Sequence, residues 1–174
     1  YLDWSVHTVT ENPNVDVRLG VCAGPETVAA ERPDAVIMAV GSEPIIPKFT
    51  AAGTGKIVWV GDAEGGADIG QRVVVAGAGM TGLEAALAMS REGKQVTVVD
   101  MLPYEKIGAG GTAINLICIK NLLKEAGVEI KCGVRIQDIT ADGVLLCGPD
   151  GDEETISCDT AVLSFGFRTD QALL

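Results

Sequence analysis

The sequence predicts an α/β fold with a parallel sheet. Two runs of β-branched residues, 72–77 and 95–100, flank a stretch of strong helix formers at 83–92. Two further apolar runs, 34–41 and 159–166, each begin with an aspartate and end in glycine. Strands that alternate with helices in this way are typical of βαβ units, whose strands lie parallel.

The N-terminal third is predicted to contain short elements joined by breaks. Leu2, Val6 and Val9 fall on one helical face, and Asn12–Asn14 interrupts the pattern. We expect a helix at 1–10, a strand at 15–19, a helix at 25–31 and a buried parallel strand at 34–41. A proline-containing linker follows, and then a short strand at 56–62 that leads into a loop rich in Gly and Asp.

The remaining elements follow from propensity and periodicity. In order, we expect a strand at 72–77, a glycine-rich turn at 77–82, a helix at 83–92 closed by Gly93, a strand at 95–100, a loop at 101–111 and a helix at 112–127. The segments at 128–140, 143–147 and 153–158 are predicted to be short antiparallel strands. The run at 159–166 then repeats the pattern of 34–41.

The composition limits the classes of partner. The 174 residues are 47% hydrophobic and 21% charged, with a net charge of −11 and an isoelectric point near 4.4. Binding to nucleic acid or to an anionic membrane surface requires clustered Lys and Arg, so we expect neither partner. Backbone N–H groups can still hold a phosphorylated small molecule.

The cysteines and the single histidine favour a cytoplasmic protein without a metal site. The five cysteines include no C-x-x-C pair, and His7 is the only histidine. This set does not fit a zinc site of usual spacing. We therefore expect reduced, mostly buried thiols, and His7 at the surface.

Three glycines form the strongest motif. Gly77, Gly79 and Gly82 make a G-x-G-x-x-G pattern between a predicted strand and a predicted helix, and Asp100 ends the next strand 18 residues later. This context is typical of a dinucleotide-binding βαβ unit. The first glycine permits a tight turn, the second lets a pyrophosphate approach the backbone, and the third lets helix and strand pack closely. Backbone groups of Ala78, Met80 and Thr81 complete the candidate phosphate loop. The competing explanation is a tight connection with glycines placed by chance.

Asp100 predicts which dinucleotide binds. Its carboxylate can accept hydrogen bonds from the adenosine ribose and repel a 2′-phosphate, and Met101 continues the same edge. No arginine occupies positions 101–103. We therefore predict NADH rather than NADPH, unless Asp100 is an ordinary strand-end acid. Lys106 either steers a phosphate or is a solvated loop lysine.

The run GAGMTGLEAALAMSREGKQVTVVDMLP resembles the pyridine-nucleotide domain of the two-dinucleotide-binding-domain flavoproteins. It is most similar to the group of 2,4-dienoyl-CoA reductase, enoate reductase, NADH oxidase and trimethylamine dehydrogenase. PDAVIMAVGSEPIIP and DTAVLSFGFRTDQALL resemble that group's two crossover segments. The resemblance implies an NAD domain at 51–158, flanked at 1–50 and 159–174 by remnants of a split FAD domain. A Rossmann-like parallel sheet with an antiparallel strand crossover is then the expected architecture.

The resemblance also assigns residues. Glu84 matches a glutamate that approaches the nicotinamide, although it could simply be a first-turn acid that complements the helix dipole. Gly41 and Gly166 match the crossover glycines, with Gly166 near the nicotinamide. VWVGDA at 58–63 mimics a flavin-contacting Gly-Asp motif that should come later in the chain, so we expect no flavin contact there. Without a C-x-x-C pair, the disulfide-reductase branch is set aside.

By the same resemblance, NADH transfers hydride to FAD in an intact parent protein. FMN and an iron–sulfur cluster would belong to a barrel outside this chain. The flavin glycine loop and the late Gly-Asp motif are not in the sequence, so we expect this chain alone to be inactive and the rest of the parent to be its partner. No catalytic acid, base or nucleophile stands out. A non-catalytic NAD- or ADP-binding module and an S-adenosylmethionine-dependent transferase are the alternatives.

Overall fold

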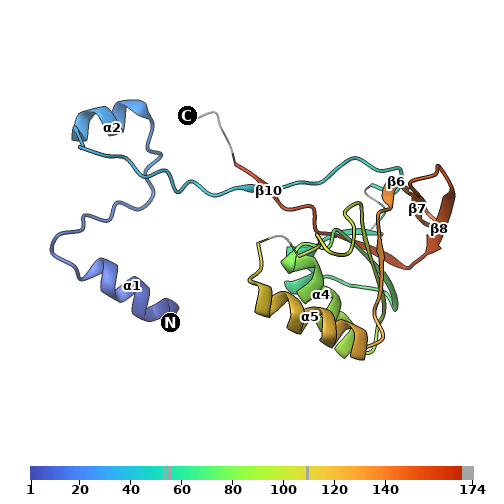
Figure 1. The fold of residues 1–174 in the computed structure, drawn as a ribbon. Helices are drawn as coiled ribbons and strands as arrows, with labels where there is room; N and C mark the ends of the chain where they lie inside the picture. Colours follow the sequence, from blue (N-terminus) through green and yellow to red (C-terminus); the bar gives the residue numbers. More distant parts are fainter. Residues whose placement is uncertain (53, 55, 109, 170–174) are drawn as a thin grey trace. The chain divides into compact units, whose positions relative to one another are not determined.

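The computed structural model describes residues 1–52, 54, 56–108 and 110–169. These residues fall into two compact units, Tyr1–Gly41 and Ser42–Thr169 (Figure 1). These units divide the described residues differently from the expected domain boundaries at 50 and 158, which stay a prediction.

The first unit contains the two predicted helices but neither predicted strand. Helix α1 runs from Leu2 to Thr10 and helix α2 from Pro25 to Glu31. The segments 15–19 and 34–41 form no strand, and within 34–41 the side chain of Ile37 is 91% exposed. A strand exists only when its backbone pairs with a neighbour. The described residues offer 34–41 no such neighbour, so the prediction of a buried strand is wrong for this structure.

The second unit holds all remaining elements. They are β1 (Glu43–Pro44), β2 (Ile57–Trp59), α3 (Val60–Glu64), β3 (Arg72–Ala76), α4 (Met80–Arg91), β4 (Gln95–Asp100), α5 (Ala113–Glu125), β5 (Glu129–Cys132), β6 (Arg135–Ile139), β7 (Gly143–Cys147), β8 (Glu153–Ser157), β9 (Thr160–Leu163) and β10 (Phe167–Arg168). Instead of the expected Gly/Asp loop after β2, the chain enters α3. Helices α4 and α5 end with the hydrogen bonds of a Schellman motif at Gly93 and Gly127, as predicted for Gly93.

A five-stranded parallel sheet in the order β2-β9-β3-β4-β5 forms the centre of this unit. Strand β5 was expected to be antiparallel, but α5 crosses back over the sheet and lays β5 parallel to β4. Strand β9 lies between β2 and β3, so residues 160–163 complete the sheet that carries the glycines. This placement is why the compact unit extends beyond residue 158.

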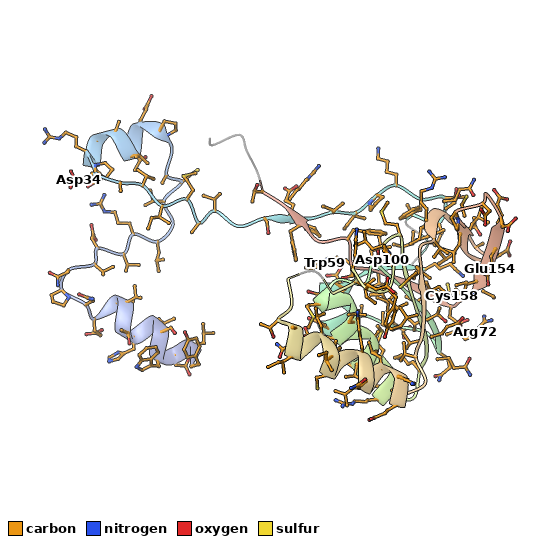
Figure 2. The ribbon with its side chains drawn as sticks, viewed as in Figure 1. Asp34, Trp59, Arg72, Asp100, Glu154 and Cys158 are labelled. Atoms are coloured by element: carbon orange, nitrogen blue, oxygen red, sulfur yellow. The ribbon has the colours of Figure 1, made fainter. Side chains whose placement is uncertain are left out.

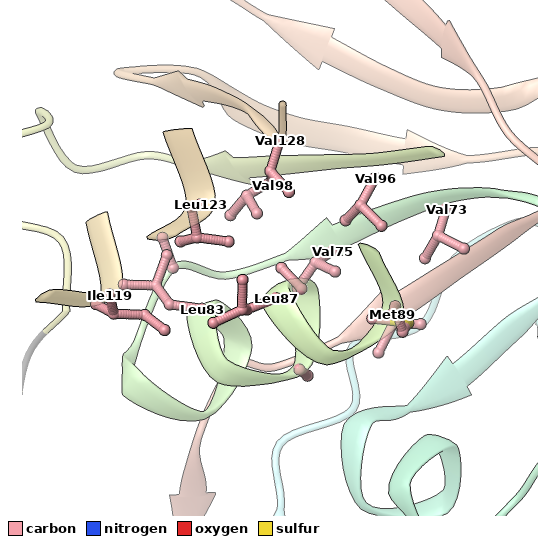
Figure 3. Close-up of a cluster of buried hydrophobic side chains, with 14 of the residues drawn as sticks. Val73, Val75, Leu83, Leu87, Met89, Val96, Val98, Ile119, Leu123 and Val128 are labelled. Carbon is pink, nitrogen blue, oxygen red and sulfur yellow. The ribbon is translucent and has the colours of Figure 1, made fainter. Parts of the chain in front are cut away.

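Both faces of the sheet are covered, which explains the continuous apolar runs. One face packs against α4 and α5, where Val75, Leu83, Val98 and Leu123 are fully buried (Figure 3). Burial of one such side chain contributes about 2 kcal/mol relative to exposure. The parallel sheet with its crossover helices is the Rossmann-like nucleotide-binding fold that the sequence predicts.

The other face is covered by a three-stranded antiparallel sheet, β6-β7-β8, as predicted from the turns at 142–143 and 150–151. Ile139, Val144 and Leu146 are buried against Val99 and Leu163 of the parallel sheet. This layer also places the start of β6 beside the end of β4. It therefore contributes to the site described below.

The cysteines are less buried than expected. Only Cys158 is buried, whereas Cys22 and Cys118 are exposed and the other two are intermediate. All five thiols are free. Burial raises the pKa of the Cys158 thiol, which keeps this side chain protonated at neutral pH.

None of the helices in the described part of the chain has the length and apolar character needed to traverse a lipid bilayer.

An exposed ion pair holds the beginning of β3 against the beginning of β9. The Asp159 carboxylate accepts hydrogen bonds from the backbone N–H of Arg72 (2.8 Å) and from its guanidinium (2.7 Å). These donors, first the side chain and then the backbone, lower the pKa of Asp159 to about 2 from an ordinary 3.8.

We predict that this carboxylate makes stability depend on pH in acid. A depressed folded-state pKa contributes stability above the unfolded value of 3.8, and this contribution is lost as the pH falls toward about 2. Urea denaturation between pH 5 and pH 2 should show Asp159→Asn less stable than wild type at pH 5. The difference should shrink toward pH 2, and a constant difference would contradict the assignment.

Candidate functional site

A cavity of about 630 Å³ lies where β3, β4 and β9 end. Its lining residues are Pro47, Phe49, Gly77, Gly79, Val99, Asp100, Met101, Leu102, Val134, Arg135, Ile136, Ser164, Phe165 and Gly166. Ligands of open α/β sheets bind outside the carboxyl ends of the strands, so this position is the expected one. Another hollow of similar volume lies between α3 and the second half of α4. Its lining includes neither the three glycines of the motif nor Asp100.

The glycine loop, residues 77–82, forms one wall of the cavity. Gly77 has φ +106°, and a Cβ on it would overlap the carbonyl oxygen of Ser164. Such a backbone conformation and such a close approach both require glycine. Gly79 is the N-cap of α4, and a Cβ on it would meet no atom of the described residues within 4 Å. Helix α4 therefore begins at Met80, three residues before the prediction.

The N-terminus of α4 has no side-chain cap within the described residues. In contrast, Thr112 accepts a hydrogen bond from the Asn115 N–H and caps α5 (3.4 Å). The first N–H groups of a helix have no partner within the helix, and the helix dipole places partial positive charge there. The uncapped first turn of α4 is thus free to hold an anion at the edge of the cavity.

Asp100 braces the glycine loop, a role that the sequence did not reveal. One carboxylate oxygen accepts from the Ala78 N–H (2.6 Å) and the other from the Leu102 N–H (2.7 Å). Each oxygen keeps a second lone pair for a ligand hydroxyl. Figure 2 labels Asp100, which ends β4. The same side chain can therefore position the loop and contact a ribose.

The loop at 101–111 packs against the beginning of α4. The Gly108 N–H donates to the Ala78 carbonyl (2.7 Å), and the side chain of Ile107 is buried. A Cβ on Gly111 would crowd the Met80 side chain. Lys106 is exposed and does not line the cavity, which favours the solvated alternative.

The cavity brings together part of the predicted site. Gly77, Gly79, Asp100, Met101 and Gly166 line it. The remaining residues of the glycine loop adjoin it without lining it: Ala78, Met80, Thr81 and Gly82. Of the two predicted residues that remain, Gly41 and Glu84, the first belongs to the first compact unit, where its φ is +82°.

Glu84 lies outside the lining. Because α4 begins at Met80, Glu84 is the fifth helical residue, and the first turn holds no acidic residue. The alternative of a first-turn acid is therefore wrong. The Glu84 side chain is exposed, and its expected approach to a nicotinamide stays a prediction.

The segment that mimics a flavin motif has a structural role. Residues 57–59 are strand β2, and Gly61 lies in α3, where a Cβ would overlap the ring of Trp59. Close packing under an indole thus explains this glycine. Asp62 does not line the cavity.

Several groups of lining residues were missed by the sequence reasoning. Ser164 and Phe165 follow β9, and the carboxyl-end rule for parallel strands could have found them. Phe49 reaches the cavity because the Ala51 N–H donates to the Ile139 carbonyl (2.8 Å). Val134 and the first two residues of β6, Arg135 and Ile136, come from the antiparallel layer. No local sequence pattern reveals where this layer lies relative to β4.

The chain matches the family described as pyridine nucleotide-disulphide oxidoreductase over residues 3–174. The NADH oxidase of Thermoanaerobacter brockii is 31% identical over 171 residues, which cover 95% of this chain and 26% of that protein. The cinnamate reductase of Clostridium sporogenes is 28% identical over 167 residues, covering 95% and 25%. The chain thus spans about a quarter of the length of these curated relatives.

Solved structures agree with this relationship. A 2-naphthoyl-CoA reductase in complex with 2-naphthoyl-CoA is 27% identical, with a TM-score of 0.71 over 91% of this chain and 24% of that chain. A water-forming NADH oxidase from Lactobacillus brevis bound to NADH is 25% identical, with a TM-score of 0.57 over 76% and 30%. Since the family match covers nearly every residue, the chain belongs to the pyridine nucleotide-disulphide oxidoreductase family.

Proposed function

We propose that this chain is the NADH-binding module of an NADH-dependent flavoprotein oxidoreductase. The observation that carries the proposal is the uncapped N-terminus of α4, which opens through Gly79 onto a cavity that also contains Asp100. The space in front of Gly79 accommodates a group that approaches the backbone, and the N–H groups suit an anion. The relatives that are NADH oxidases support the choice of nucleotide.

Different residues would contact different parts of the dinucleotide. The N–H groups at the beginning of α4 would hold the diphosphate, which lets a chain of net charge −11 bind an anion. Asp100 would accept hydrogen bonds from the adenosine ribose hydroxyls. The apolar side chains of Leu102, Val134 and Ile136 would surround the adenine. The nicotinamide end would extend toward Gly166, with Glu84 as its proposed neighbour.

When bound, NADH supplies a hydride that a flavin accepts. We propose that residues 1–50 and the segment that follows β9 belong to a split FAD domain, as in the reductase group that contains 2,4-dienoyl-CoA reductase, whereas β9 itself completes the nucleotide-binding sheet. The antiparallel pairing of β1 with β10 supports this placement, because it joins the two segments that resemble crossovers. FMN and an iron–sulfur cluster would lie in other parts of such a protein.

The experiment is rapid mixing of NADH with the flavin-containing protein that carries this chain, followed at 450 nm. Loss of flavin absorbance at a rate that saturates with NADH supports the proposal. The position of Glu84 outside the cavity favours one rival, a module that holds NAD without passing electrons. Tight NADH binding without flavin reduction would establish that rival, and absence of binding would refute both.

We predict a preference for NADH over NADPH of about ten- to a hundred-fold, because Asp100 repels a 2′-phosphate and solvent screens part of this repulsion. Asp100→Ala should narrow the preference and also weaken both nucleotides, since the Ala78 N–H loses its acceptor. Asp100→Asn should narrow the preference with a smaller general loss, because its amide oxygen still accepts. Calorimetric titration of both nucleotides into the wild type and the two variants measures the preference. Tighter binding of NADPH than of NADH to the wild type would contradict the prediction.

A further inference from the structure

The chain reversal between β5 and β6 is hydrogen-bonded to the end of β4 and to the residues that follow it. The Gly133 N–H donates to the Leu102 carbonyl (3.0 Å), and the Val134 N–H donates to the Asp100 carbonyl (3.1 Å). Arg135 is the next residue, so it begins β6 beside the strand end that carries Asp100. Backbone pairing, rather than a flexible loop, thus sets the position of Arg135.

Arg135 also borders a second hollow. This smaller cavity of about 360 Å³ is lined by Met101, Gly133, Arg135, Cys147, Gly148, Pro149 and Gly151. Within the part of the chain that the structure describes, Met101 and Arg135 alone line both cavities. These two residues therefore stand where the candidate nucleotide cavity meets an adjoining empty space.

The charges of the cavity lining are simple. Among the described residues that line it, Asp100 and Arg135 are the only charged ones. Among the described residues, Arg18, Arg72 and Arg168 each pair with a carboxylate, whereas no carboxylate lies within 4.0 Å of the exposed Arg135. The Asp100 carboxylate is already held by two backbone N–H groups. The guanidinium of Arg135 is thus available to a ligand.

We propose that Arg135 is a specificity-determining residue that attracts a phosphate at the 2′ position of the adenosine ribose. The proposal rests on the proposed function, in which Asp100 contacts that ribose and disfavours the 2′-phosphate. A guanidinium binds phosphate through two parallel hydrogen bonds. Selectivity is then the difference between repulsion by Asp100 and attraction by Arg135. The smaller hollow beside Met101 offers space for the phosphate.

The experiment compares ADP-ribose with 2′-phospho-ADP-ribose by calorimetry, because these ligands need no nicotinamide contact. Arg135→Gln should weaken the 2′-phosphorylated ligand roughly three- to fivefold and change ADP-ribose less than twofold. Arg135→Lys should keep part of the difference. At 0.5 M salt the effect of Arg135→Gln should fall. Arg91→Gln is the matched control, because it makes the same charge change in the last turn of α4, outside both cavities.

Each other outcome overturns the proposal. Equal weakening of both ligands by Arg135→Gln would mean that Arg135 contacts the common part of the nucleotide. Unchanged affinities, or an equal effect of Arg91→Gln, would remove Arg135 from the site or reduce its role to net charge. If the wild type binds neither ligand, the proposed function itself fails. If the wild type binds ADP-ribose but Arg135→Gln changes the affinity for neither ligand, only this inference fails.

Discussion

Gly79→Val is expected to lower the affinity for NADH by about 100-fold or more while leaving the fold intact. A Cβ at this position meets none of the described residues within 4 Å, so the added side chain occupies the space in front of α4. Displacement of a diphosphate from two N–H groups forfeits charge-assisted hydrogen bonds of about 1.5–3 kcal/mol each. The Gly79 backbone, with φ −68° and ψ 173°, suits any residue. Calorimetry with NADH and thermal unfolding of the same samples measure the two effects.

Gly79→Ser is expected to weaken NADH binding without lowering the stability of the protein. Serine is a good N-cap, and its hydroxyl would accept from the free N–H groups of the first turn. We expect the Tm to stay the same or rise slightly while NADH binds more weakly, because the hydroxyl competes with the diphosphate. For valine, a less favoured N-cap, the loss of stability should not exceed about 1 kcal/mol. Unchanged NADH affinity in both variants would remove the glycine loop from the nucleotide site.

The sequence predicted the nucleotide half of this unit well because its signals are local. A β-branched run, spaced glycines and an amphipathic stretch are each determined within about ten residues, and they became β3, the glycine loop and α4. Asp100 could be placed for the same reason, since it ends a strand that is adjacent in sequence and in space. The cavity in the structure lies outside the carboxyl ends of the parallel strands, where ligands of such sheets bind.

The errors occur where the outcome depends on distant residues. The run at 34–41 has the composition of a buried strand, but the described residues provide no pairing partner. Strand β9 has the same pattern and enters the centre of the sheet between β2 and β3. Likewise, the bond from the Ala78 N–H to Asp100 and the approach of Arg135 depend on contacts 22 or more residues apart in sequence.

Gly82→Ala is expected to destabilise the protein, which reverses the usual effect of this change in a helix. Alanine in place of glycine ordinarily stabilises a helix by about 0.5–1 kcal/mol. Here the new Cβ would overlap the carbonyl oxygen of Gly77 and lie 3.1 Å from the Ser164 hydroxyl oxygen. The Gly77 carbonyl belongs to the backbone, so no side-chain rotation can relieve this overlap. Overpacking of this kind costs about 1–3 kcal/mol.

The loss should appear in thermal unfolding as a Tm decrease on the order of 5–10 °C, since about 1 kcal/mol corresponds to a few degrees in a domain of this size. Gly79→Ala is the matched control, because it adds the same methyl group three residues earlier, where no described residue lies within 4 Å of it. It should shift the Tm by no more than a few degrees. A higher Tm for Gly82→Ala would show that α4 can move away from Gly77. The close contact between helix and strand, which is the physical reason for the third glycine of the motif, would then be absent in solution.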